Sequence, residues 1–236
     1  MDQLLLSRMT DGRPEIFASI QGEGPSAGQP STFVRLAVCN LQCSWCDTAY
    51  TWDWSRFERS EQVMALAAEQ VVHAVRELAP RRVVITGGEP LLQRRQLVPF
   101  AEALKEQDHW LEVETNGTVL PTGLETLIDQ FNVSPKLLHS GNEGLARIRP
   151  APLRWFASDP RAYFKFVVQS EPDIAEVEAL CGAYMVPSER VVLMPEGRSA
   201  EDLHERSPWL AEVCTQRGYR FSTRLHILIW GDKRGV

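Results

Sequence analysis

The stretch "TFVRLAVCNLQCSWCDT" (Thr32–Thr48) begins with a segment that contains several β-branched residues, and three closely spaced cysteines follow it directly. Its first part, Thr32–Val38, is mostly apolar on successive positions, which predicts a strand buried on both faces of a parallel sheet. The cysteines Cys39, Cys43 and Cys46 follow with the spacing C-x3-C-x2-C. Three thiolates in so short a loop can bind one soft metal centre.

Strands and helices alternate along the rest of the chain, and this order predicts an α/β fold with right-handed crossovers and an open or closed parallel barrel. Five further segments are expected to be strands: Arg82–Gly87, Leu111–Gly117, Phe131–Pro135, Tyr163–Val168 and Arg190–Pro195. Four helices are expected between them. The first is capped by Ser60 and has one apolar side, formed by Val63, Leu66, Ala67, Val71, Val75 and Leu78, and the second has an apolar side formed by Leu97, Phe100, Ala101 and Leu104. The third begins at Pro172, and the fourth runs from Ser199 to near Gly218.

Composition and charge exclude several classes of protein. The 236 residues carry 25 Lys and Arg against 31 Asp and Glu, a net charge of −6, which argues against a nucleic-acid partner. No basic leader and no run of roughly 18 apolar residues is present, so neither a signal peptide nor a membrane partner is expected. Five cysteines, three of them clustered, do not resemble a disulfide framework, and a cytoplasmic location is predicted.

We expect a single domain over residues 1–236, because the sequence contains no repeat and no convincing linker. The segment His139–Pro160 is rich in Gly, Pro and Arg, which predicts a long loop. Polar signatures follow the predicted strands, and ligands gather at the carboxyl ends of parallel strands. These signatures are "CNLQCSWC", "TGGEP", "ETNG", "SPK" and "MPEG". They predict an active site along one shared rim.

The cysteine triplet has two interpretations. A structural zinc site normally takes four protein ligands, and the triplet has no fourth thiol or imidazole nearby in the sequence. A four-iron cluster held by three cysteines instead leaves one iron open for a small molecule. The remaining cysteines, Cys181 and Cys214, lie on apolar helical faces and are expected to be small buried residues.

The triplet, with Trp45 before its last cysteine, resembles the cluster loop of radical S-adenosylmethionine enzymes, and "TGGEP" (Thr86–Pro90) resembles their glycine-rich stretch. Gly87 and Gly88 would let the backbone approach a ligand closely. Further stretches resemble the 7-carboxy-7-deazaguanine synthases of this superfamily: "FASIQGEG" (Phe17–Gly24), "ITGGEPLLQ" (Ile85–Gln93), "ETNG" (Glu114–Gly117), "SPK" (Ser134–Lys136) and "STRLHILIWGDKRGV" (Ser222–Val236). The resemblance spans about residue 15 to the C-terminus, except Arg94–Trp110 and His139–Pro160.

The resemblance implies a partial (β/α)6 TIM-like barrel of the radical SAM type, in which N-terminal and C-terminal segments complete the substrate pocket. It implies a lyase that contracts 6-carboxy-5,6,7,8-tetrahydropterin to 7-carboxy-7-deazaguanine and releases ammonia, a step in making queuosine-type 7-deazapurines for tRNA modification. The implied cofactors are a [4Fe-4S] cluster, S-adenosylmethionine and Mg²⁺. The implied partners are an electron donor such as flavodoxin or ferredoxin and a second copy of the chain in a homodimer.

The same resemblance assigns roles to individual residues. The cluster would be held by Cys39, Cys43 and Cys46, and Mg²⁺ by Thr48. S-adenosylmethionine would contact Trp45, Asp47, Gly88, Ser134, Pro135 and Lys136. The pterin would contact Ile20, Gln21, Gly22, Glu23, Arg35, Thr86 and His226.

Simpler interpretations remain open for several of these residues. Arg35 could form an ordinary ion pair, Lys136 could be a solvated charge at a strand end, and His226 could be a half-buried structural histidine. Asp47 and Thr48 could cap the following turn. Two other functions also remain: another radical SAM enzyme, such as a glycyl-radical activase, and a non-catalytic metal-clipped module acting on tRNA.

Overall fold

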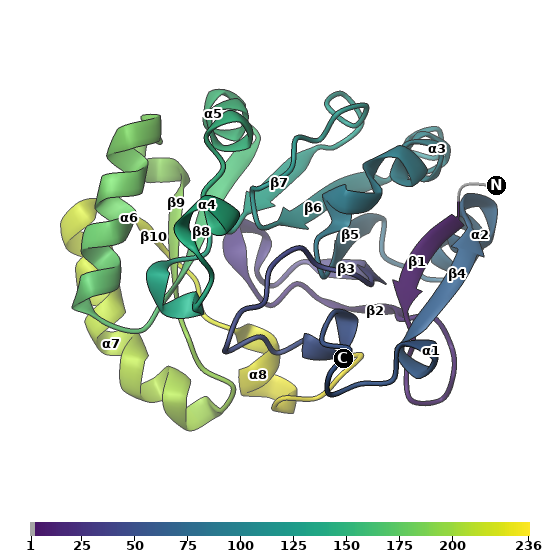
Figure 1. Ribbon diagram of the computed structural model, residues 1–236, viewed down its shortest axis with the longest axis horizontal. Helices are drawn as coiled ribbons and strands as arrows, with labels where there is room; N and C mark the ends of the chain where they lie inside the picture. The colour runs from purple at the N-terminus through teal and green to yellow at the C-terminus, as the bar shows by residue number, and fades with distance from the viewer. Residues whose placement is uncertain (1–2) are drawn as a thin grey trace.

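The computed structural model describes residues 3–236 as a mixed sheet with helices on its outer side (Figure 1). The strands are β1 (Gln3–Ser7), β2 (Ile16–Ile20), β3 (Pro30–Leu36), β4 (Val63–Ala67), β5 (Arg82–Gly87), β6 (Trp110–Thr115), β7 (Gln130–Val133), β8 (Ala162–Val168), β9 (Val191–Pro195) and β10 (Arg220–Phe221). The helices are α1 (Arg59–Gln62), α2 (Ala68–Arg76), α3 (Arg94–Lys105), α4 (Gly144–Arg147), α5 (Pro150–Ser158), α6 (Glu171–Tyr184), α7 (Ala200–Arg217) and α8 (Leu225–Trp230).

The sheet is a partial barrel, as predicted. Its order is β10-β9-β8-β7-β6-β5-β3-β1-β4, and every neighbouring pair from β3 to β10 is parallel. The two ends, β10 and β4, do not pair with each other, so the barrel stays open. Each predicted strand is present, with shifts of at most two residues at either end. The sequence analysis missed β1, β2 and β4, which pair antiparallel, and the short β10, which pairs parallel with β9.

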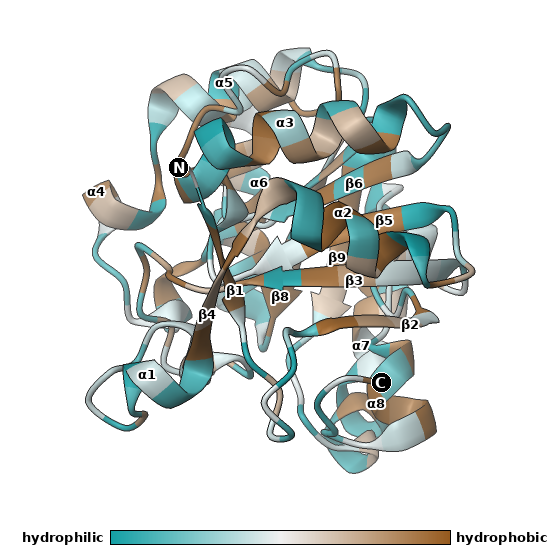
Figure 2. Ribbon diagram, turned by 90° about the vertical axis from the view of Figure 1, so that its right-hand side faces the viewer, coloured by the Kyte–Doolittle hydropathy of each residue, from teal (hydrophilic) through white to brown (hydrophobic). Residues whose placement is uncertain are grey.

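The two faces of the parallel strands differ in chemistry. Alternate apolar residues point to the helices and form the core, among them Leu36 of β3, Ile85 of β5 and Val113 of β6. Their neighbours Arg35 and Thr86 face inward and line a cavity. Because side chains alternate across a strand, each strand contributes to both the core and the cavity. The helices α2 and α3 cover the outer side of β5 and β6 (Figure 2).

Three of the predicted helices are confirmed. The apolar residues of α3, including Leu97 and Phe100, are fully buried. In α7 the Ser199 hydroxyl accepts the backbone N–H of Asp202 at 3.0 Å, and Gly218 ends the helix in the left-handed conformation with φ of 68°. Helix α6 begins at Glu171 with proline at its second position.

The prediction of one helix from Ser60 to Leu78 is wrong in its first part. Residues Val63–Ala67 form β4, which pairs antiparallel with β1, and the helix begins only at Ala68. Ser60 lies inside the short helix α1, whose N-cap is Glu58. Pairing with the N-terminal strand overrides the helical spacing of these residues, because propensity is weaker than tertiary packing.

The long loop expected at His139–Pro160 is also wrong. Helices α4 and α5 occupy most of it, and α5 begins at Pro150, a residue suited to the first helical position. Phe156 of α5 is fully buried against Phe131, with ring centroids 5.4 Å apart. Burial of aromatic and apolar side chains therefore fixes a segment whose Gly and Pro content indicated a loop.

Within residues 3–236, no helix combines the length and the apolar character that a membrane crossing requires.

We predict that Phe156→Ala lowers the free energy of unfolding by about 3–5 kcal/mol, because it leaves a cavity under α5. Leu145→Ala in the neighbouring α4 is the control, since Leu145 is 84% exposed, and it should change stability by less than about 0.5 kcal/mol. Urea unfolding followed by circular dichroism measures both. Equal midpoints for the two variants would show that α5 is not packed as described.

Candidate active site

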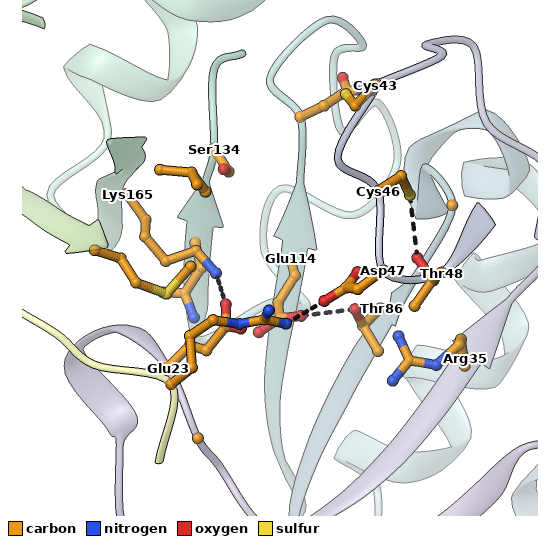
Figure 3. Close-up of a pocket in the computed structure, with 18 of the residues that line it drawn as sticks. Glu23, Arg35, Cys43, Cys46, Asp47, Thr48, Thr86, Glu114, Ser134 and Lys165 are labelled. Atoms are coloured by element: carbon orange, nitrogen blue, oxygen red, sulfur yellow. Dashed lines mark hydrogen bonds and ion pairs between the residues drawn. The ribbon is translucent and has the colours of Figure 1, made fainter. Parts of the chain in front are cut away.

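One cavity of about 220 Å³ opens at the carboxyl ends of the parallel strands. A single water molecule needs only about 10–15 Å³, so this space admits small organic molecules. Its lining includes every residue expected at the site except Pro135: Ile20, Gln21, Gly22, Glu23, Arg35, Cys39, Cys43, Trp45, Cys46, Asp47, Thr48, Thr86, Gly88, Ser134, Lys136 and His226. Pro135 instead borders a small apolar cavity beside α6. Figure 3 shows Cys43 and Cys46 toward one end of the large cavity and Glu23, Glu114 and Arg35 toward the other.

The loop with the three cysteines leaves β3 directly beside the two glycines that end β5. A Cβ atom at Gly87 would strike the backbone of Leu36, and one at Gly88 would strike that of Val38. The Gly88 N–H donates to Leu36 O at 3.0 Å, and the Glu89 N–H donates to Val38 O at 2.9 Å. The expectation that these glycines serve a close ligand contact is therefore incomplete, because their first requirement is to let the cysteine loop pass.

Each sulfur of the triplet accepts one N–H group. The donors are the backbone N–H of Leu41 to Cys39 at 3.4 Å, Asn142 Nδ2 to Cys43 at 3.3 Å, and Trp52 Nε1 to Cys46 at 3.3 Å. All three cysteines are free thiols. Donors of this kind stabilise thiolate ligands and tune the potential of iron–sulfur clusters, so the loop fits a cluster.

Within residues 3–236, no three His, Cys, Asp or Glu side chains are grouped so that they could hold one metal ion. A [4Fe-4S] cluster has a different requirement, because each cysteine binds a different iron. Burial raises the pKa of the Cys39 thiol to about 12 and also raises that of Cys43, so binding of iron has to displace these protons.

A network of charged side chains lies in the cavity wall. Lys165 forms an ion pair with Glu23, and Arg224 Nε donates to the same carboxylate at 3.0 Å. Arg224 also forms an ion pair with Asp47 and donates to Gly197 O at 2.8 Å. This one guanidinium thereby joins the N-terminal "QGEG" turn, the cysteine loop and the end of β9.

The network keeps its members charged. Burial raises the pKa of the Glu23 carboxyl, but Lys165 and Arg224 outweigh burial and hold that pKa well below its usual value. Burial likewise opposes the charge of Arg224, whose pKa is nevertheless raised by Asp47 and Glu23. Two carboxylates and two cations are therefore fixed in the cavity wall.

The inward-facing residues at the ends of β3, β5 and β6 lie next to one another in the cavity wall. They are Arg35, Thr86 and Glu114. The Thr86 hydroxyl donates to Glu114 Oε2 at 2.6 Å, and Gln21 Nε2 donates to Glu114 Oε1 at 3.1 Å. Arg35 Nε pairs with Glu15 at 2.7 Å, which confirms the ordinary ion pair, while Arg35 still lines the cavity. In the part of the chain that the structure describes, its two terminal nitrogens have no hydrogen-bond partner and are available to a ligand.

His226 of α8 packs against the "QGEG" turn. A Cβ atom at Gly22 would overlap the His226 ring, so a larger residue there would have to displace the imidazole. Burial lowers the pKa of His226; Glu23 opposes this effect and Arg224 adds to it. The imidazole is therefore neutral at pH 7. Among residues 3–236 no group hydrogen-bonds the ring.

Turn capping does not account for Thr48. Thr48 precedes the short helix Ala49–Thr51, but its side chain makes no capping bond and lies 3.6 Å from Cys46 Sγ. Lys136 is not merely solvated, because its Nζ donates to Ser134 Oγ at 2.9 Å and lies 5.5 Å from the Trp45 ring centroid.

Sequence reasoning assigned no role to four residues of the site: Lys165, Arg224, Asn142 and Glu114, although Glu114 begins the quoted "ETNG" signature. A charged residue at the inward parity of a predicted strand was the available signal for Glu114 and Lys165. Arg224 lies two positions before His226, within a stretch that was quoted for its histidine. Asn142 lies in the segment that was expected to be a loop and carries no such signal.

We predict that Arg224→Gln lowers the free energy of unfolding by about 3 kcal/mol, because it leaves the largely buried Glu23 with one cation fewer and the partly exposed Asp47 without its ion pair. The matched control is Arg198→Gln, whose exposed pair with Asp232 also reaches the C-terminal segment and should contribute about 0–1 kcal/mol. Urea unfolding of both variants checks this. A loss in Arg224→Gln no larger than in the control would contradict the network.

Comparisons with known proteins agree with this geometry. The family model of the radical SAM superfamily matches residues 34–155. The chain is 42% identical over 224 residues to the 7-carboxy-7-deazaguanine synthase of Pyrobaculum aerophilum, covering 94% of this chain and 95% of that protein. It is 35% identical to the protein of the same name from Halobacterium salinarum, with 92% and 90% covered. The crystal structure of QueE from Escherichia coli matches with a TM-score of 0.71 and 25% identity over 95% of each chain. The chain therefore belongs to the 7-carboxy-7-deazaguanine synthase family of radical S-adenosylmethionine enzymes.

Proposed function

We propose that the protein is a lyase that contracts 6-carboxy-5,6,7,8-tetrahydropterin to 7-carboxy-7-deazaguanine with release of ammonia, in 7-deazapurine biosynthesis of the queuosine type. One observation carries this proposal: the residues that the family resemblance assigned to cluster, cofactor and pterin line one cavity, with the single exception of Pro135. They come from separate stretches of the chain between Ile20 and His226, so only the fold brings them together. The names of the relatives agree with the product.

The cysteine end of the cavity supports binding of the [4Fe-4S] cluster and S-adenosylmethionine that radical SAM enzymes use. When bound, these cofactors supply the 5′-deoxyadenosyl radical that removes a hydrogen atom from the substrate. Trp45, Ser134 and Lys136 line the same end and provide an aromatic face, a hydroxyl and a cation for the cofactor. The role of the protein is to place the reacting atoms next to each other and exclude water.

The opposite end supports recognition of a pterin. Glu23 and Glu114 are acceptors suited to the N–H groups of the pterin's aminopyrimidine edge. The free fork of Arg35 suits a carboxylate or a ring carbonyl. His226 contributes a neutral ring nitrogen that can donate or accept one hydrogen bond.

Mg²⁺ at Thr48 is part of the proposal. Mg²⁺ prefers hard oxygen ligands and usually keeps several water molecules. The hydroxyl of one threonine, together with oxygens of the substrate, would therefore be enough to hold it. Thr48 lines the cavity between the cysteine loop and Arg35, and no capping bond occupies its side chain. Asp47 would act through its ion pair with Arg224 rather than as a ligand.

The proposal also covers the domain organisation, the oligomeric state, the location and the electron donor of the enzyme. We regard residues 1–236 as one radical SAM domain acting as a homodimer in the cytoplasm, with flavodoxin or ferredoxin as electron donor. The five free cysteines are compatible with a reducing compartment. Gln21–Glu23 from the N-terminal part and Arg224 and His226 from the C-terminal part complete the pterin end of the cavity.

The test is anaerobic reconstitution followed by an assay with the carboxytetrahydropterin, S-adenosylmethionine, Mg²⁺ and a reductant. We expect 7-carboxy-7-deazaguanine, and no turnover in Cys39→Ala, Cys43→Ala or Cys46→Ala because each loses a cluster ligand. Product from any of these three variants at the wild-type rate would overturn the assignment.

Thr48→Ala should raise the Mg²⁺ concentration needed for half-maximal activity by about tenfold, because it removes the proposed oxygen ligand. Thr48→Ser keeps a hydroxyl and should stay close to wild type. Iron content should be unchanged in both variants. An unaltered Mg²⁺ requirement in Thr48→Ala would place the ion elsewhere.

His226 should make substrate capture pH-dependent. Burial lowers its pKa from 6.5, so the neutral form persists at pH 7 and is lost only as the pH falls through the lower folded value. The acid limb of kcat/KM from this group should therefore lie below pH 6.5. His226→Gln should remove that limb and raise KM about tenfold, the effect of roughly one lost hydrogen bond. An identical limb in His226→Gln would assign it to another group.

A further inference from the structure

Asn142 holds two consecutive residues of the cysteine loop at once. Its Oδ1 accepts the backbone N–H of Gln42 at 2.8 Å, and its Nδ2 donates to Cys43 Sγ at 3.3 Å. Asn142 is 99 residues away from Cys43 in sequence. The side chain thus joins the segment before α4 to the loop that carries the cluster ligands.

The orientation of the Asn142 amide follows from its partners. The Gln42 N–H is a donor, so the atom that faces it must be the carbonyl oxygen. This leaves the NH2 group for Cys43 Sγ and for Ser140 Oγ at 3.2 Å. The flipped amide would place two donors against each other and an oxygen against the sulfur.

The segment that presents Asn142 is fixed on both sides. The Ser44 N–H donates to Ser140 O at 3.0 Å, which adds a second link to the cysteine loop. On the far side, the buried Arg147 donates to Lys136 O at 2.9 Å and pairs with Glu176 at 2.5 Å. Asn142 is therefore held in place and is not simply part of a flexible connection.

Of the three N–H donors on the sulfurs, only that of Asn142 comes from outside the stretch Cys39–Trp52. A hydrogen bond to a thiolate ligand stabilises the extra negative charge of the reduced cluster and so raises its reduction potential. We infer that Asn142 is a positioning and potential-tuning residue, which orients the Cys43 thiolate and makes the cluster easier to reduce. This inference rests on the cluster of the proposed function.

Two substitutions separate the two roles of the side chain. Asn142→Asp keeps an oxygen for the Gln42 N–H but places a carboxylate oxygen, with no N–H, against Cys43. Asn142→Ala removes both bonds. Leu145→Ala, an uncharged change at an exposed site three residues away, controls for disturbance of the segment.

The measurement is a redox titration of the anaerobically reconstituted enzyme, with the reduced cluster followed by electron paramagnetic resonance in the absence of S-adenosylmethionine. At a fixed solution potential, Asn142→Ala should lower the ratio of reduced to oxidised cluster about tenfold, which is about 59 mV for one electron. Asn142→Asp should lower it further, because it adds a negative charge. Leu145→Ala should match the wild type.

A second readout is independent of activity and of the absolute potential. After exchange into deuterated buffer, the amide deuterium of Asn142 should show a magnetic hyperfine coupling to the reduced cluster of the wild type. This coupling should be absent in both Asn142 variants. Unchanged potentials in Asn142→Ala and Asn142→Asp at full iron content would overturn the inference. Failure of Asn142→Asp to assemble a cluster would also overturn it, since it would assign Asn142 to assembly alone. Absence of a cluster in the wild type would instead overturn the proposed function.

Discussion

Gly87 and Gly88 lie so close to the backbone of Leu36 and Val38 that neither position has room for a side chain. This contact lets the cysteine loop cross the end of β5 and enter the cavity, while Glu89 locks the ends of β5 and β6 together. The Glu89 carboxylate accepts the Thr115 hydroxyl at 2.8 Å and the Asn116 N–H at 2.6 Å. A larger residue at either glycine would displace the loop and with it all three thiols, so the site depends on this close approach.

The inner face of the barrel accepts buried charge, which fixes side chains that line the cavity. Replacing a buried ion pair by apolar residues is often neutral or stabilising, so the pairs of Glu23, Lys165, Arg224 and Asp47 are not explained by stability. Their effect is geometric, because two cations hold the Glu23 carboxylate in one position in the cavity wall. The core that offsets this cost is built by the opposite parity of the same strands. Fold and site are therefore encoded in alternate residues.

The parallel strands and most of the site could be predicted because their signals are local. The composition of the strands and the C-x3-C-x2-C spacing can be read directly from the sequence. The quoted motifs directly follow the predicted strands, so their place at one edge of the sheet could be predicted too. Val63–Ala67 was mistaken for helix because its pairing with β1, about 60 residues earlier, leaves no local trace. Arg224 and Asn142 were missed for the same physical reason, since each acts through partners that only the folded chain brings near.

The central claim is that the cysteine loop holds a cluster with one iron free of protein ligands, facing the cavity where substrate binds. Mössbauer spectroscopy of anaerobically reconstituted, iron-57-enriched protein tests it most directly, before and after S-adenosylmethionine is added. The account predicts a [4Fe-4S] spectrum in which one of the four irons changes its parameters when S-adenosylmethionine binds. A spectrum in which no iron responds, or a protein that holds zinc in place of iron, would contradict it.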